Sequence, residues 1–136
     1  MSDRIAKALA NHDKNFNCYQ SVACAYCDLV GVDEETMFKA AEAFGLGMGG
    51  MEGTCGAIAG AVLLAGFKNS SANLEHPDSK GQTYKLSAAI VKEFLEKNGA
   101  TACRDLKGKD TGVILRTCPG CIEDAAAIAE KILELK

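Results

Sequence analysis

The sequence has no tryptophan and little other aromatic or proline content. Aromatic residues make up 6% of its 136 residues, and its two prolines are Pro77 and Pro119. So few aromatic side chains leave little surface on which nucleic-acid bases could stack. With no proline before Pro77 and no alternation of polar and apolar residues, the sequence favours helices over strands.

The sequence also lacks an excess of positive charge. Its 15 Lys and Arg residues stand against 18 Asp and Glu residues, which gives a net charge of −3. A chain with this charge balance has no excess of positive charge to bind a nucleic-acid backbone or an anionic lipid surface. We therefore expect neither nucleic acid nor membrane among its partners.

Long apolar runs and several well-known motifs are missing as well. Residues 1–17 contain no apolar segment of signal-peptide length, and the longest apolar run, 57–67, is too short to span a bilayer. We expect a soluble, cytoplasmic protein whose thiols are kept reduced. Nucleotide-binding, zinc-protease and esterase motifs (GxxxxGK[ST], HExxH, GxSxG) do not occur.

The segments between the glycines have a helical composition, rich in Ala, Glu, Lys and Leu. Segment 55–66 is apolar on all sides, which is typical of a helix at the centre of a bundle. We predict an all-α fold: a single domain over residues 1–136, with about five helices around this buried apolar central helix. Helices are expected at 2–12, 18–30, 33–44, 55–66, 82–98 and from 118 onward, with a short turn at 103–106.

Seven cysteines are the most informative residues. Four of them come where a helix is expected to begin, and the free amide groups there favour thiolate over thiol. An odd number of cysteines in a chain without an export signal argues against a fixed disulfide framework. The sequence therefore predicts chemistry at sulfur, as a nucleophile, a disulfide partner or a metal ligand. The four candidate residues are Cys18, Cys55, Cys103 and Cys118.

Cys55 follows segment 45–53, which contains five glycines in nine residues. A loop so rich in glycine allows the backbone to approach a bound group closely. We therefore expect Gly53, Gly56 and Gly60 to be cofactor-binding positions. The alternative is that Cys55 is simply a small buried apolar residue.

Two pairs of cysteines have CxxC spacing. Cys118 and Cys121 form CPGC at an expected helix start, which suits either a redox pair or two ligands of one metal ion. Cys24 and Cys27 have the same spacing within a helix, where a core role is favoured. His12 and His76 have no partner at ligand spacing, so we expect neither to bind metal.

The string FGLGMGGMEGTCGAIAGAVLLAG, with FNCYQSV, TACRDLKG and TCPGC, resembles the family of redox-active proteins named for its C-GCAxxG-C-C pattern. The resemblance covers nearly the whole chain and implies a redox role. The family is also similar to a domain of split-Soret cytochromes, which carry haem and an iron–sulfur centre, but no CxxCH motif for covalent haem is present here. The family's four cysteines fall on Cys18, Cys55, Cys103 and Cys118, and the additional ones are Cys24, Cys27 and Cys121.

Three functions are left open by these observations. In the first, Cys55 attacks a disulfide, Cys18 resolves the intermediate, and electrons pass to a redox partner protein. Cys103 and Cys118 then form a second or auxiliary pair. In the second, the same four cysteines bind an iron–sulfur cluster or zinc. In the third, buried cysteines only fill a helical bundle that forms a homo-oligomer.

Overall fold

Seven α-helices dominate the computed structural model, which describes residues 1–135. Over these residues the only β-structure is a single antiparallel bridge between Thr54 and Ala102. The all-α prediction is confirmed, and the seven helices correspond to the six expected helices and the short turn expected at 103–106. The helices are α1 (Asp3–Asp13), α2 (Cys18–Ala25), α3 (Glu34–Glu42), α4 (Gly56–Asn69), α5 (Lys80–Asn98), α6 (Cys103–Lys107) and α7 (Cys118–Leu133), with short turns η1 (Cys27–Val30) and η2 (Gly47–Met51).

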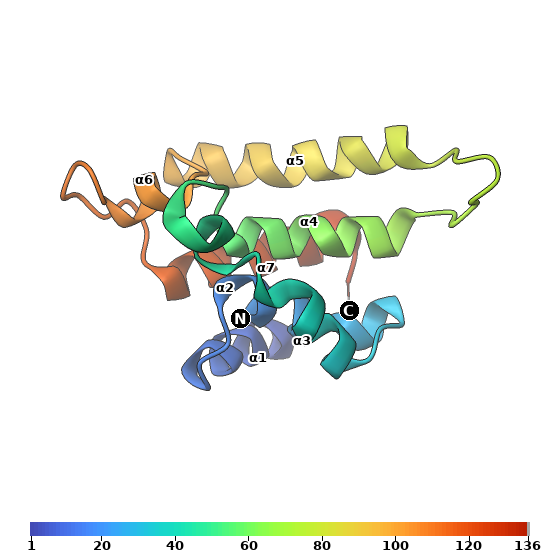
Figure 1. Ribbon diagram of the computed structural model, residues 1–136, viewed down its shortest axis with the longest axis horizontal. Coiled ribbons are helices and arrows are strands. Elements are labelled where there is room, and N and C mark those ends of the chain that lie inside the picture. The colour runs from blue at the N-terminus through green and yellow to red at the C-terminus, as the bar shows by residue number, and fades with distance from the viewer. Residues whose placement is uncertain (136) are drawn as a thin grey trace.

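The helices are arranged around α4 and α7. Helix α4 packs against α2, α5 and α7, while α7 also contacts α1, α2 and α5. Figure 1 shows α5 lying alongside α4, with α1, α2 and α3 on the opposite side and α6 near one end of the bundle. Within the described residues, none of these helices combines the length and apolar character needed to cross a membrane.

Helix α4 is apolar around its whole circumference but is not covered on every side. Ala59, Val62 and Leu63 are only partly buried, and Phe67 is 46% exposed. These positions are spaced three or four residues apart and so lie on one face of the helix. The opposite face of α4 forms a large part of the core. The other described helices therefore cover only a part of the apolar surface of α4.

The helix starts are defined by capping residues that the sequence partly predicts. Asn17 caps α2: its Oδ1 accepts a hydrogen bond from the Gln20 amide (2.8 Å), and Gln20 Oε1 accepts one from the Asn17 amide (3.0 Å). Helix α7 is capped by Thr117, whose Oγ1 accepts a hydrogen bond from the Gly120 amide. Cys118 is therefore the first helical residue, and its sulfur is not used as the cap.

Glycines allow α2 and α4 to approach closely. A Cβ atom on Gly60 would lie 2.9 Å from the Tyr19 carbonyl oxygen, and one on Gly56 would lie 3.4 Å from Cys18 Cβ. The first turn of α4, which follows Cys55, therefore lies directly beside the first turn of α2. Gly56 and Gly60 serve helix packing, and these contacts give no support to their expected role in binding a cofactor.

Replacing Gly60 with alanine should destabilise the protein by about 1–3 kcal/mol, because the added methyl group meets backbone atoms of α2 that cannot move aside cheaply. The matched control is Gly66→Ala on the same helix, where an added Cβ would have no atom within 4 Å. There the better helix propensity of alanine should stabilise by up to about 1 kcal/mol. Urea unfolding of both variants measures the difference, and equal effects would contradict the close approach.

Candidate functional site

The starts of α4 and α6 are joined by backbone hydrogen bonds. The Cys55 amide donates to the Thr101 carbonyl (2.8 Å), and the Cys103 amide donates to the Gly53 carbonyl (3.0 Å). These two bonds flank the bridge between Thr54 and Ala102. Two cysteines that are 48 positions apart in the sequence are thereby placed at neighbouring helix starts.

The glycine-rich loop before Cys55 packs against α6. Leu46, Gly47, Met48 and Gly49 all have positive φ, so the chain turns tightly through left-handed conformations. A Cβ on Gly47 would lie 2.6 Å from Cys103 Cβ, so only glycine fits there. Gly53, also expected to bind a cofactor, donates its amide to the Gly47 carbonyl, and the loop is thus held against protein atoms.

Cys18 and Cys118 form one pair of thiols across the starts of α2 and α7. A hydrogen bond from the Cys18 thiol, together with one from the Lys107 ammonium group, lowers the pKa of Cys118 to about 5 despite partial burial. The same hydrogen bond, with burial, raises the pKa of Cys18. His12 lies near Cys118 and makes a smaller contribution in the same direction. Within this pair, the lowered pKa therefore belongs to Cys118 and the raised pKa to Cys18.

Cys55 and Cys121 form a second pair between the starts of α4 and α7. A hydrogen bond from the Cys121 thiol lowers the pKa of Cys55 to about 7, and the amides of Ala57 and Ile58 at the start of α4 support the thiolate against the cost of burial. The hydrogen bond to Cys55, with burial, raises the pKa of Cys121. From the sequence we expected Cys18 as the partner of Cys55 and regarded Cys121 as an additional cysteine. In the structure the partner of Cys55 is Cys121.

The two pairs differ in access to solvent. Cys55 and Cys121 are 5% and 3% exposed, whereas Cys18 and Cys118 are both half-buried. Cys118 thus combines the lower pKa with the better access. Since the thiolate is the reactive form of cysteine, the lower pKa and the better access both favour Cys118 over Cys55 as the attacking sulfur. All seven cysteines are free thiols in the structure.

Cys103 lies beside these pairs but has no thiol partner among the described residues. Burial raises its pKa, and the charge of Lys107, four residues further along α6, opposes that rise. Arg104, the next residue, is turned outward and forms ion pairs with Glu52 (2.6 Å) and Asp110 (2.9 Å). The charges of Cys55 and Cys118 also act on Cys103, and its expected pairing with Cys118 stays a prediction. Arg104 ties the glycine-rich loop to α6.

Cys24 and Cys27 belong to the core. Cys24 is fully buried, and Cys27 donates its thiol to the Cys24 carbonyl (3.3 Å). Burial raises the pKa of Cys24 to about 12 and also raises that of Cys27. Both are protonated near neutral pH, in agreement with the core role that their position favoured.

Possible metal ligands among the described side chains are His, Cys, Asp and Glu. In the part of the chain that the structure describes, no three His, Cys, Asp or Glu side chains converge closely enough to hold an ion. A zinc or iron–sulfur site needs about four ligands around one point. Binding of zinc or an iron–sulfur cluster by Cys18, Cys55, Cys103 and Cys118 stays a prediction.

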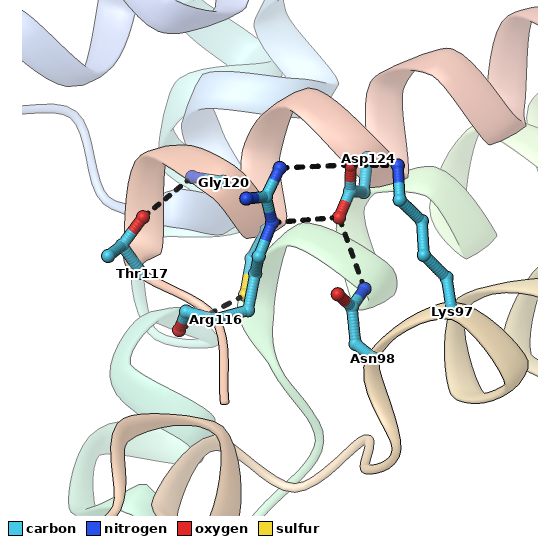
Figure 2. A network of polar contacts seen from close by, with 7 residues as sticks. Lys97, Asn98, Arg116, Thr117, Gly120 and Asp124 are labelled. Atoms are coloured by element: carbon cyan, nitrogen blue, oxygen red, sulfur yellow. Dashed lines mark hydrogen bonds and ion pairs between the residues drawn. The ribbon is translucent and has the colours of Figure 1, made fainter. Parts of the chain in front are cut away.

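A buried carboxylate holds the start of α7 in place. The Asp124 side chain, 2% exposed, accepts hydrogen bonds from Lys97 (2.7 Å), Asn98 (3.1 Å) and Arg116 (3.0 Å), as Figure 2 shows. The Arg116 guanidinium group covers Gly120, where a Cβ would lie 2.5 Å from its Nε. The Cys121 thiol faces the Arg116 carbonyl at 3.9 Å. This network joins the end of α5 to the turn that carries both cysteines of the CPGC motif.

Sequence reasoning missed Cys121 as a partner and did not consider Lys107. The CxxC spacing did indicate Cys121, since residues three apart at a helix start lie on the same face. For Lys107 the available signal was its position four residues after Cys103 in an expected helical turn, which places both residues on one face. No local sequence pattern could show that this face of α6 lies toward Cys118 in the folded protein.

A family model described as "Putative redox-active protein (C_GCAxxG_C_C)" matches residues 16–132. No curated protein and no solved structure matches the chain. The matched range contains all the cysteines of both thiol pairs.

Proposed function

The chain belongs to the C_GCAxxG_C_C family of redox-active proteins, and we propose that its redox chemistry is dithiol–disulfide exchange at Cys18 and Cys118. What supports this proposal is that Cys18 and Cys118 begin two different helices, are both half-buried rather than buried, and act on each other's pKa. The Cys118 sulfur, with the lowered pKa, has the Lys107 ammonium group beside it. The Cys18 sulfur, with the raised pKa, is a thiol that can attack in the second step. An attacking and a resolving cysteine need this combination.

The exchange has two steps. The Cys118 thiolate attacks one sulfur of a partner disulfide R–S–S–R, forms the mixed disulfide Cys118–S–S–R and releases the first R–S⁻. Cys18 then loses its proton and attacks the Cys118 sulfur, which forms the Cys18–Cys118 disulfide and releases the second R–S⁻. The partner gains two electrons, the proton of Cys18 passes to a released thiolate, and the reverse sequence reduces the protein again.

Oxidation in the presence of a small disulfide tests this proposal. The reduced full chain is treated with oxidised glutathione, its remaining thiols are blocked at low pH, and its peptides are mapped by mass spectrometry. We expect a Cys18–Cys118 disulfide that dithiothreitol reverses. Absence of any disulfide from either pair after oxidation would contradict the proposal. So would stoichiometric iron and sulfide, or zinc, at these cysteines after anaerobic purification.

Lys107 should be needed for the low pKa of Cys118. Replacing it with methionine removes the ammonium charge and should raise the pKa of Cys118 by roughly 1 unit, because an adjacent cation favours the thiolate. The pH dependence of Cys118 alkylation by iodoacetamide measures the shift. Lys109→Met, which removes an equal charge from the exposed loop nearby, is the control and should leave the profile unchanged. Equal pH profiles of alkylation in the unsubstituted protein and both variants would show that Lys107 does not lower the pKa of Cys118.

A further inference from the structure

The two thiol pairs are connected through the first turn of α7. Cys118 belongs to the half-buried pair and Cys121 to the buried pair, and they are three residues apart on one helix. Residues at this spacing lie on the same helix face, and two cysteines at CxxC spacing can form a disulfide with each other. The pairs also interact across the bundle, since Cys18 lies near Cys55 and both Cys18 and Cys118 lie near Cys121.

We propose that the protein stores four electrons and that a disulfide formed at the half-buried pair Cys18–Cys118 moves inward to the buried pair Cys55–Cys121. This inference rests on the proposed function, because it requires Cys118 as the entry point. It adds a direction of transfer and assigns a role to Cys121. Solvent access favours oxidation of the half-buried pair before the buried pair, because Cys55 and Cys121 are only 3–5% exposed and a bulky disulfide cannot reach them directly.

The inward transfer consists of two internal exchanges. Cys121 attacks the Cys118 sulfur of the outer disulfide, forms Cys118–S–S–Cys121 and displaces Cys18. The Cys55 thiolate then attacks the Cys121 sulfur, forms Cys55–S–S–Cys121 and displaces Cys118 as a thiolate. No outside oxidant is consumed, since one disulfide is broken for each one formed. The proton that leaves Cys121 is taken up by Cys18, and the negative charge of Cys55 passes to Cys118.

The relative acidity of the two thiolates favours the inward direction. Hydrogen bonds from Cys18 and Lys107 hold the pKa of Cys118 below that of Cys55, so a Cys118 thiolate is the better leaving group. After the transfer the more stable thiolate is again free at the half-buried position. The outer pair can then react with a second partner disulfide, so that two partner molecules are reduced before the protein is fully oxidised.

Limited oxidation of the full chain tests the transfer. Reduced protein receives one equivalent of oxidised glutathione, and samples are trapped with acid and N-ethylmaleimide over time before peptide mapping. In the unsubstituted protein the first disulfide should appear at Cys18–Cys118 and later be found at Cys55–Cys121. A second equivalent should then restore the outer disulfide. Oxidation that stops after two electrons would overturn the inference.

Two variants and one control separate the steps. Cys121→Ser should keep the disulfide at Cys18–Cys118, and Cys118→Ser should slow oxidation of Cys55–Cys121 by about tenfold or more because their sulfurs are buried. Cys27→Ala removes a thiol of the core outside both pairs and should leave the transfer unchanged. Circular dichroism establishes that each variant is folded.

Each outcome assigns the failure to one proposal. If Cys18–Cys118 forms in the unsubstituted protein but Cys55–Cys121 never does, the inward transfer is wrong and the proposed function stands. If Cys55–Cys121 forms at the unsubstituted rate in Cys118→Ser, the buried pair is oxidised independently and the transfer is again wrong. If no disulfide forms in either pair, the proposed function itself fails.

Discussion

Replacing Cys118 with serine should abolish intramolecular disulfide formation at the half-buried pair and slow the first reaction with oxidised glutathione at least about tenfold at about pH 5.5. With its pKa lowered to about 5 by the hydrogen bonds from Cys18 and Lys107, Cys118 is mostly thiolate at that pH. An ordinary thiol, with a pKa of about 8.5, is only about 0.1% ionised there. The lower basicity of Cys118 makes each thiolate less nucleophilic, which offsets a part of this advantage but not all of it.

The pH dependence of the reaction distinguishes this explanation from simple exposure. Because the pKa of Cys118 is lowered, its reactivity should rise as the pH increases through about 5 and level off near neutrality. In Cys118→Ser, the remaining reaction at Cys18 should still be rising above about pH 8. Cys27→Ala serves as the control with the same number of thiols. The assignment would be contradicted if the Cys118→Ser protein kept the rise in reactivity near pH 5. It would also be contradicted if this variant formed a Cys18–Cys55 disulfide as fast as the unsubstituted protein forms Cys18–Cys118.

Replacing Asp124 with alanine should lower the free energy of unfolding by about 2–3 kcal/mol. The variant leaves Arg116 and Lys97 without the buried carboxylate that they share, although both retain contact with solvent, which limits the loss. Urea unfolding followed by circular dichroism measures the change. Asp110→Ala, which removes an exposed carboxylate paired with Arg104, is the matched control and should change stability little. Similar losses in both variants would show that burial of Asp124 is unimportant.

The stabilisation by Asp124 should depend on pH. Burial opposes ionisation of this carboxyl group, but the hydrogen bonds from Lys97, Arg116 and Asn98 outweigh it and lower its pKa below the ordinary value. A carboxyl group with a lowered folded-state pKa contributes its full stability above the unfolded pKa of about 3.9, and that contribution is lost as the pH falls through the folded pKa. The difference between the unsubstituted protein and Asp124→Asn should therefore shrink in acid.

Helix composition and capping residues made most of the fold predictable. Asn17 and Asp33 mark the starts of α2 and α3, because a side-chain oxygen before a helical segment satisfies a free amide. Gly31 ends the second helical segment in a left-handed conformation, which glycine adopts readily. The sequence did not show that this segment changes to a 3-10 turn after Ala25. It also could not show that one face of α4 is left partly uncovered, since both depend on tertiary packing.

The sequence identified the residue types of the site better than their partners. Local signals place Cys18, Cys55 and Cys118 at helix starts, but pairing depends on how three helices meet. That geometry is set by close contacts such as Gly56 against α2, which periodicity cannot reveal. The role of Lys107 beside Cys118 is likewise a tertiary contact. A pattern of four cysteines predicts sulfur chemistry, whereas only the fold shows which sulfurs lie near one another.

A redox titration with disulfide mapping tests the central claim most directly. The full chain is equilibrated in glutathione buffers of increasing oxidation, trapped with acid and alkylated, and its cysteine linkages are identified at each potential by mass spectrometry. The two-pair arrangement predicts reversible Cys18–Cys118 and Cys55–Cys121 disulfides, with Cys24 and Cys27 reduced throughout. Thiols that stay reduced at every potential, or a different linkage such as Cys18–Cys55 or Cys103–Cys118 as the main product, would contradict it.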